Sequence, residues 1–195
     1  MAVNRARPIE KLSAELHALQ ERKKEASRTT EYREGTPCVF ISHKREDTEA
    51  CRKIADYLMN AGVDVYFDEY DETLSRIALV GNEEQLTKRI TDGINMSTHM
   101  LCVVSPQTVD SYWVPFEVGY GYDKIDLGIL TLKGIQDSDL PDYMLVTDVV
   151  RGTGTLNEFI AELLDESQSQ LEKKGGFVKE SARSHPLDNV LERYR

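Results

Sequence analysis

The amino-acid sequence predicts a protein of the α/β class, with a parallel sheet that helices cover on both faces. Short apolar runs alternate with segments of helical periodicity, which is typical of parallel strands joined by helical crossovers. Two of the runs, CVFIS at 38–42 and MLCVVS at 100–105, show no polar alternation, as expected of strands buried on both faces. We therefore expect these two runs to be central strands.

The N-terminal part of the chain predicts an amphipathic helix within residues 8–27. Its apolar side chains recur at intervals of three or four residues, at Ile9, Leu12, Leu16 and Leu19. This stripe covers about two heptads, fewer than the three to four that indicate a coiled coil. We expect the helix to dock on the domain or on a partner.

Five strands and the helices around them follow in regular order. The expected strands lie at 38–42, 63–67, 100–105, 127–132 and 143–150. A helical pattern follows each of the first three strands and the last one. The apolar positions are Ala50, Ile54, Ala55, Leu58 and Met59 after the first strand, and Leu86, Ile90 and Ile94 after the second. The third pattern is SYWVPFE, with Ser111 as its cap, and the last runs from Leu156 to Leu164. Five strands suit a flavodoxin-like order, in which ligands bind beyond the carboxyl ends of the first and third strands.

The patterns divide the chain into three parts. Residues 1–36 are expected to form the N-terminal helix and a linker, 37–165 the α/β domain, and 166–195 a charged C-terminal extension that we interpret as a tail. A chain of 195 residues suits one full domain with appendages.

Composition excludes several classes of function. A formal net charge of -10 argues against a sequence-independent nucleic-acid binder, and no apolar run approaches the length of a membrane span. The N-terminus has no apolar secretion signal, so we expect a cytoplasmic protein. Cys38, Cys51 and Cys102 are expected to be reduced, packed thiols, and the histidines have no metal-ligand spacing.

One acidic residue, Glu117, lies in the apolar stretch SYWVPFEVGYG, one helical turn beyond the predicted ligand crevice. A buried carboxylate is costly unless something compensates. The alternative to a functional role is that Glu117 points to solvent or caps a neighbouring backbone amide. Trp113, four residues earlier on the same helical face, is as well explained by core packing as by stacking on a ligand ring. The acidic group after the second strand, Asp68 with Glu69, Asp71 and Glu72, is more often a solvated loop than a cation site.

Several motifs in family order resemble Toll/interleukin-1 receptor (TIR) domains, especially bacterial ones. They are FISHKRED at 40–47, GVDVYFDE at 62–69, GINMS at 93–97, VVSP at 103–106 and SYWVPFE at 111–117. The resemblance covers roughly residues 37–165 and departs from the family at Val114, where many members have Cys. It implies a TIR fold and, as in many bacterial and plant members, cleavage of the nicotinamide–ribose bond of NAD.

The resemblance also implies the site residues. Glu117 corresponds to the catalytic glutamate, and the substrate-binding residues carried over are Phe40, Ser42, His43, Lys44, Arg45, Asp68 and Trp113. At the end of the first strand, the Ser42 hydroxyl, backbone amides and the cations suit a pyrophosphate. Nicotinamide leaves as a neutral base, so one carboxylate suffices for the reaction. No cofactor or metal is expected, because the resemblance implies NAD as the substrate.

Three candidate functions remain. The favoured one is an NAD glycohydrolase or ADP-ribosyl cyclase of antiphage defence, whose product signals to a downstream effector or whose activity depletes NAD. The alternative is a non-catalytic TIR scaffold that recruits partners, and nucleoside transfer by a related fold is a third possibility. In the family, the loop at 70–82 mediates TIR–TIR self-association and gates the site, so we expect self-association here.

Overall fold

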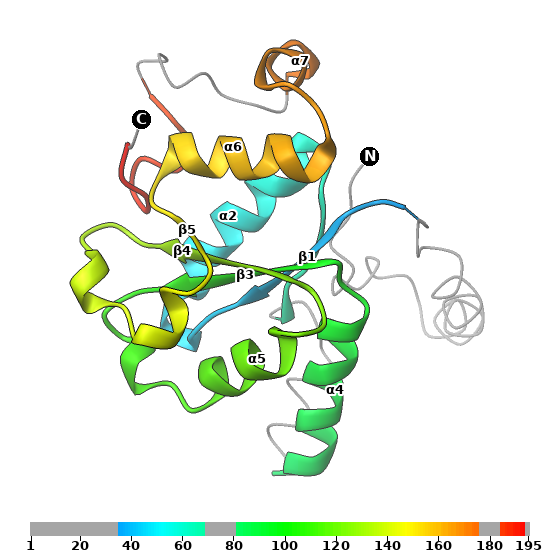
Figure 1. Ribbon diagram of the computed structural model, residues 1–195, viewed down its shortest axis with the longest axis vertical. Coiled ribbons are helices and arrows are strands. Elements are labelled where there is room, and N and C mark those ends of the chain that lie inside the picture. The colour runs from blue at the N-terminus through cyan, green and yellow to red at the C-terminus, as the bar shows by residue number, and fades with distance from the viewer. Residues whose placement is uncertain (1–34, 69–80, 176–183, 194–195) are drawn as a thin grey trace, which may run out of the picture.

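The computed structural model describes residues 35–68, 81–175 and 184–193, which include one five-stranded parallel sheet. The strand order is β2-β1-β3-β4-β5 (Figure 1). The strands are β1 (Cys38–Ser42), β2 (Asp64–Tyr66), β3 (His99–Val104), β4 (Asp126–Thr131) and β5 (Asp148–Val150). The α/β class, the flavodoxin-like order and the central position of β1 and β3 are confirmed.

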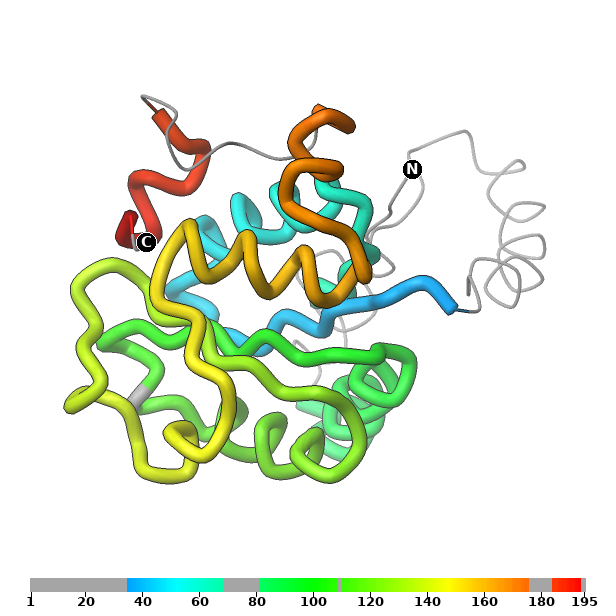
Figure 2. Tube along the Cα trace, turned by 45° about the horizontal axis from the view of Figure 1, so that its top comes forward, coloured from blue at the N-terminus to red at the C-terminus, as the bar shows by residue number. Residues whose placement is uncertain are grey.

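Helices cover both faces of the sheet. On one face lie α2 (Thr48–Ala61) and α6 (Thr153–Leu164), and on the other lie α4 (Glu83–Asn95) and α5 (Trp113–Gly121) (Figure 1). The short α7 (Gln168–Lys174) contacts α6, and Figure 2 shows these layers from a second angle. Four short 3-10 turns complete the described elements: η1 (Arg45–Asp47), η3 (Thr108–Asp110), η4 (Asp137–Asp139) and η5 (Asp142–Met144).

The continuous apolar character of β1 follows from its central position. Val39 and Ile41 belong to the core under α2 and α6, whereas Cys38 and Phe40 belong to the core under α4 and α5. Successive side chains of a strand point to opposite faces, so both faces of this strand must be apolar.

The chain turns sharply from α2 into β2 at Gly62. Its φ of 106° lies in the left-handed region, which favours glycine, and the amide of Val63 donates to the Leu58 carbonyl at 3.0 Å. This turn ends the helix at the predicted NAG sequence and brings Asp68, after β2, to the carboxyl edge of the sheet.

The predicted strand at 143–150 is too long. Only Asp148–Val150 pairs with β4, and the preceding residues form η5 and a turn in which the Leu145 amide donates to the Asp142 carbonyl. Met144 alone of the run from Tyr143 to Val146 is buried. One residue of this apolar run is therefore buried and its neighbours are exposed, a difference that the sequence pattern does not show.

The interpretation of residues 166–195 as a tail is wrong for the part that the structure describes. Leu187 and Leu191 are buried in the core with α2 and α6, and the amide of Thr153 donates to the Glu192 carbonyl at 2.9 Å. Residues 184–193 therefore belong to the folded body. The predicted N-terminal helix, and the loop at 70–82 except its last two residues, lie outside the described residues.

No helix among the described residues is long and apolar enough to cross a membrane. The three cysteines are packed in the core, as predicted.

Candidate active site

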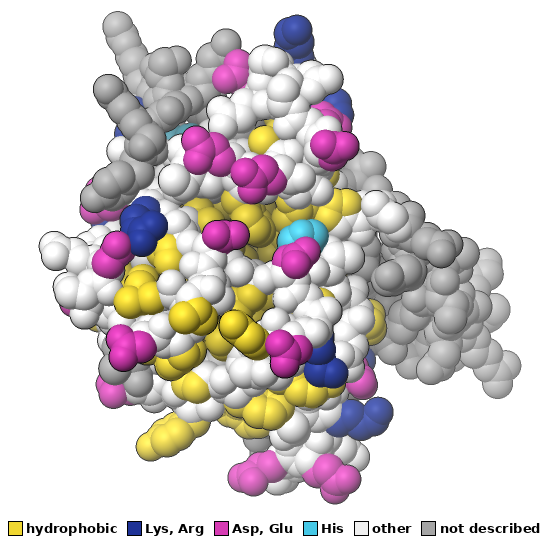
Figure 3. Space-filling model, viewed as in Figure 1, with side chains coloured by type: hydrophobic (Ala, Val, Ile, Leu, Met, Phe, Trp, Pro, Cys, Tyr) yellow, Lys and Arg dark blue, Asp and Glu magenta, His cyan; other side chains and the backbone are white. Residues whose placement is uncertain are grey.

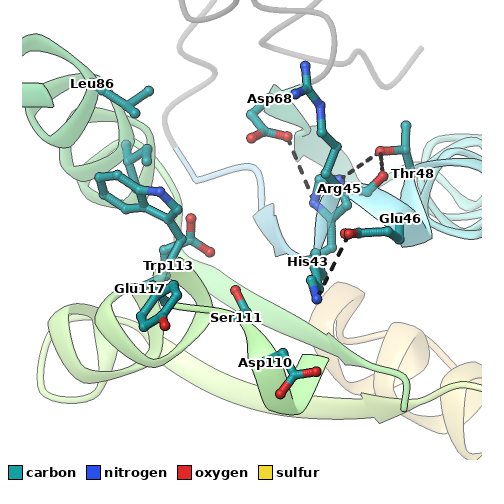
Figure 4. A pocket seen from close by; sticks show the side chains of 13 residues that line it. His43, Arg45, Glu46, Thr48, Asp68, Leu86, Asp110, Ser111, Trp113 and Glu117 are labelled. Atoms are coloured by element: carbon teal, nitrogen blue, oxygen red, sulfur yellow. Dashed lines mark hydrogen bonds and ion pairs between the residues drawn. The ribbon is translucent and has the colours of Figure 1, made fainter. Parts of the chain in front are cut away.

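A pocket of about 430 Å³ opens at the carboxyl edge of the sheet, beyond β1, β2 and β3. The segment after β1 forms one wall, the start of α5 with the segment before it forms the opposite wall, and α4 contributes apolar side chains (Figure 4). The lining residues are His43, Lys44, Arg45, Glu46, Thr48, Asp68, Leu86, Ile90, Asp110, Ser111, Tyr112, Trp113 and Glu117. This is the crevice that the strand order predicts.

Glu117 combines burial with access to the pocket. It lies on α5, its residue is only 6% exposed, and its Oε2 accepts a hydrogen bond of 2.6 Å from the Ser42 hydroxyl. Burial raises the pKa of Glu117 to about 8; the hydrogen bond from Ser42 opposes this rise and the negative charge of Asp68 adds to it. A carboxyl with a raised pKa holds its proton more tightly than an exposed glutamate does, and an approaching cation favours its ionised form.

The local sequence of α5 explains how Glu117 reaches this position. The Ser111 hydroxyl accepts a hydrogen bond from the Val114 amide at 3.2 Å, so the predicted cap is present although the first helical residue is Trp113. Val114 and Val118 are buried against the sheet. Because Glu117 lies beside them on the helix, its side chain also points inward, at the pocket end of the helix.

Trp113 lies at the pocket wall and is 37% exposed, so core packing does not account for it fully. Its ring contacts the Phe116 ring edge to face, with centroids 5.9 Å apart. The indole is thereby held in a fixed orientation with surface left for a planar ligand. Tyr112 lines the same pocket and is 94% exposed.

The opposite wall carries positively and negatively charged side chains. Lys44 lies 3.9 Å from Glu46, and His43 is held between Asp68, 3.8 Å from its Nδ1, and the Phe67 ring. Figure 4 shows the Arg45 side chain reaching outward past Asp68. This wall can place cations near a bound anion while keeping a carboxylate close to it.

The two segments that form the pocket walls are hydrogen-bonded to each other through buried side chains. The Ser105 hydroxyl donates to Asp47 Oδ2 at 2.6 Å, and both residues are buried. Thr108 in turn accepts from the Ser105 amide at 2.9 Å. The segment after β1 is thus fixed against the segment after β3, and the two pocket walls keep their separation.

The structure brings six of the eight predicted site residues to the pocket. Phe40 does not line it, because it is 2% exposed and stacks on Tyr66 in the core. Ser42 does not line it either: it is 1% exposed and its only hydrogen is donated to Glu117. The expected direct contacts of Phe40 and of the Ser42 hydroxyl with substrate are therefore corrected.

Sequence reasoning missed several lining residues. Four of them lie in the two segments that follow β1 and β3, namely Glu46, Thr48, Asp110 and Tyr112. Because the crevice was predicted at the ends of these strands, their position in the sequence could have identified them as lining residues. Leu86 and Ile90 of α4 gave no such signal, because the same apolar spacing also describes a helix face that is fully packed. No group of three His, Cys, Asp or Glu residues suited to a metal ion occurs in the part of the chain that the structure describes.

Comparison with known proteins decides the family. The model of a family described as "TIR domain" matches residues 39–164, well over half of the chain. This protein belongs to the TIR domain family. The family resemblance predicted from FISHKRED and SYWVPFE is confirmed, and the TIR domain includes every residue of the pocket.

A curated relative is similar to part of this TIR domain protein. It is called 2' cyclic ADP-D-ribose synthase BtTIR, from Bacteroides thetaiotaomicron, and is 29% identical over 80 residues. The match covers 40% of this chain and about a quarter of the length of that relative.

Proposed function

We propose that this TIR domain protein cleaves the nicotinamide–ribose bond of NAD, with Glu117 as its catalytic residue. The observation that carries the proposal is the Glu117 carboxyl, which is buried, held by Ser42 and directed at a pocket on the carboxyl edge of the sheet. The partial match to a protein named as a cyclic ADP-ribose synthase supports the same chemistry.

The reaction needs a single carboxylate. The bond between ribose C1′ and the nicotinamide nitrogen breaks, and its electron pair stays with the nitrogen, so the cationic ring leaves as neutral nicotinamide without a proton donor. Positive charge develops on the ribose, and an ionised Glu117, whose carboxyl is itself buried, stabilises it. The approaching pyridinium favours this ionised form, because opposite charges lower a carboxyl pKa.

The other pocket residues suit the remaining parts of NAD. Lys44 and Arg45 are placed to bind the pyrophosphate as charge-assisted donors. Trp113 offers its exposed surface to a planar ring near Glu117. Asp68 and His43 line the same pocket and can accept or donate hydrogen bonds at the ribose hydroxyls.

The product depends on what captures the ribose cation. Water gives ADP-ribose and releases one proton, whereas a hydroxyl of the same molecule gives a cyclic ADP-ribose and also releases one proton. A cyclic product would act as a signal on a downstream effector, and hydrolysis would deplete NAD. We place either outcome in antiphage defence, for which a plaque assay with wild-type and Glu117→Gln genes is the direct test.

The central experiment compares the wild-type protein with Glu117→Gln. This near-isosteric change removes the charge but keeps the shape, so we expect NAD cleavage to fall by at least about a hundredfold, a typical loss for one electrostatic group at a reacting centre. Products are separated by liquid chromatography and identified by mass spectrometry, at protein concentrations that permit self-association.

Glu158→Gln is the matched control, because Glu158 is exposed on α6, on the other face of the sheet. It should cleave NAD as the wild type does. Full turnover by Glu117→Gln beside an active wild type would exclude Glu117 as the catalytic residue.

A scaffold function is the alternative, and one observation favours it. Apolar side chains are exposed on α5 and the residue after it, and on η5 and the segment after it. Figure 3 shows hydrophobic side chains gathered on the face where these elements lie. They include Phe116, Tyr122, Tyr143, Leu145 and Val146. Such a surface suits protein–protein assembly. Absence of any Glu117-dependent product from an assembled wild-type protein would favour this alternative.

A further inference from the structure

We propose that Ser42 is a positioning residue, which orients Glu117 for the reaction and favours its ionised form. This proposal rests on the proposed NAD cleavage by Glu117. It replaces the substrate contact expected for Ser42 with a role exerted through another side chain.

The first step is the placement of Ser42 beneath the catalytic candidate. Ser42 is the last residue of β1 and pairs with Cys102 of β3, so the two side chains leave the sheet on the same face. That face is covered by α5, whose Val114 and Val118 pack with Cys102. Glu117 extends from the same helix over Ser42.

The second step is the direction of the hydrogen bond. Ser42 Oγ lies 2.6 Å from Glu117 Oε2, a short distance typical of a hydroxyl that donates to a carboxylate. A serine hydroxyl has one hydrogen and two acceptor sites. Its hydrogen is committed to Glu117.

The third step is the consequence for Glu117. With Oε2 held by Ser42, rotation of the carboxyl group is restricted, which leaves the second oxygen for the ribose in the pocket that Glu117 lines. A donated hydrogen bond stabilises the ionised carboxyl more than the neutral one, so Ser42 also counters the effect of burial. Both effects favour the charged, oriented form that the reaction uses.

The first test measures ionisation without activity. Carboxyl carbons of ¹³C-labelled glutamate are titrated by NMR in the ligand-free protein, and the Glu117 signal is assigned by its loss in Glu117→Gln. In Ser42→Ala we expect the Glu117 midpoint to rise by about one pH unit, equivalent to the roughly tenfold worth of a hydrogen bond to a charged group. Ser42→Thr, which keeps the hydroxyl, should return the midpoint toward that of the wild type, with Ser42→Cys as a second variant if the added methyl prevents folding.

The control is Ser97→Ala. Ser97 is a buried serine at the other end of the sheet, where its hydroxyl donates to the Gly93 carbonyl at 2.9 Å. It should leave the Glu117 midpoint unchanged, although it too deletes a buried hydroxyl. An equal midpoint in Ser42→Ala and the wild type would overturn the proposal.

The second test measures NAD cleavage. Ser42→Ala should lower kcat by at least about tenfold with little change in KM, because orientation matters most in the transition state. The pH at which kcat/KM is half-maximal should move upward and should recover in Ser42→Thr. An unchanged kcat and pH profile would overturn the positioning role even if Glu117 is catalytic. A shifted NMR midpoint in a protein that cleaves no NAD would instead refute the proposed function and retain the control of Glu117 by Ser42.

Discussion

At the scale of single residues, Glu117 shows how a candidate functional group opposes stability. Its carboxyl is buried with one hydrogen bond from Ser42 and no cation within ion-pair distance among the described residues. A neutral side chain of the same shape would fit this position at lower free energy, since burial disfavours the charge. The buried carboxyl is therefore consistent with the catalytic role that we propose for it.

This argument predicts a pH-dependent effect of Glu117→Gln on stability. The pKa of Glu117 is raised to about 8, so between the ordinary glutamate pKa and about 8 the folded protein keeps a proton that the unfolded chain has released. Stability is therefore lost as the pH rises through this window, and glutamine avoids the loss. We expect Glu117→Gln to melt at a higher temperature than the wild type at pH 8, with the difference shrinking toward pH 5. Thermal unfolding at both pH values measures this, with Glu158→Gln as control; a difference that does not depend on pH would contradict it.

The residue scale also shows what sequence could predict of the site. Glu117 and Trp113 could be placed because their spacing and their position after β3 fix them on a helix at the crevice. The role of Ser42 could not, because the strand ends at that residue and nothing in the sequence indicates whether its hydroxyl meets solvent or α5. Such contacts depend on the distance between a strand and the helix that covers it.

At the scale of elements, two helix glycines, Gly93 and Gly119, differ in how closely they approach their surroundings. Gly93 of α4 faces Tyr66, and a Cβ there would lie 2.6 Å from the tyrosine ring. That ring is buried and stacked on Phe40, so it has little freedom to move. Gly119 of α5 has nothing within 4 Å of the corresponding position. The two glycines therefore have different reasons to be there.

Alanine substitutions of these glycines should have opposite effects. Gly119→Ala should stabilise the protein by about 0.5–1 kcal/mol, because alanine loses less conformational freedom than glycine in a helix. Gly93→Ala gains the same helical preference but forces α4 away from Tyr66, and overpacking of this kind costs about 1–3 kcal/mol. Urea unfolding of both variants measures the two signs. Stabilisation by Gly93→Ala would mean that α4 tolerates displacement from the sheet.

At the scale of the whole molecule, residues 184–193 close the face that α2 and α6 cover. Leu187 and Leu191 are buried, and the Lys133 amide donates to the Val190 carbonyl at 2.8 Å. Sequence could predict the five strands, whose periodicity is local. Sequence could not predict the packing of residues 184–193. Their few apolar residues lie among charged ones, and the surface that they pack on is formed by α2 and α6, which are far apart in the sequence.

A buried polar chain joins this segment to the two helices. The Leu187 amide donates to His185 Nδ1 at 3.1 Å, which leaves the hydrogen on Nε2 for Tyr57 Oη, also at 3.1 Å. Tyr57 then donates to Asn157 Oδ1 at 2.8 Å. This arrangement requires a neutral imidazole. Burial lowers the pKa of His185; the charge of Asp188 opposes this and that of Arg193 adds to it.

The stability that depends on neutral His185 should therefore be lost as the pH falls. The unfolded chain binds a proton below about pH 6.5, the ordinary histidine pKa, whereas the folded protein resists it until the pH reaches the lowered value. Glu117 has the opposite trend in the same range, so the two partly cancel in the wild type. In the Glu117→Gln background, we expect the free energy of unfolding to decrease from pH 7.5 to pH 5.5. Adding His185→Gln should make that decrease smaller but not abolish it, since burial also lowers the pKa of His99. Urea unfolding at the two pH values measures both decreases, and an equal decrease with and without His185 would show that this segment stays attached whatever the charge of its histidine.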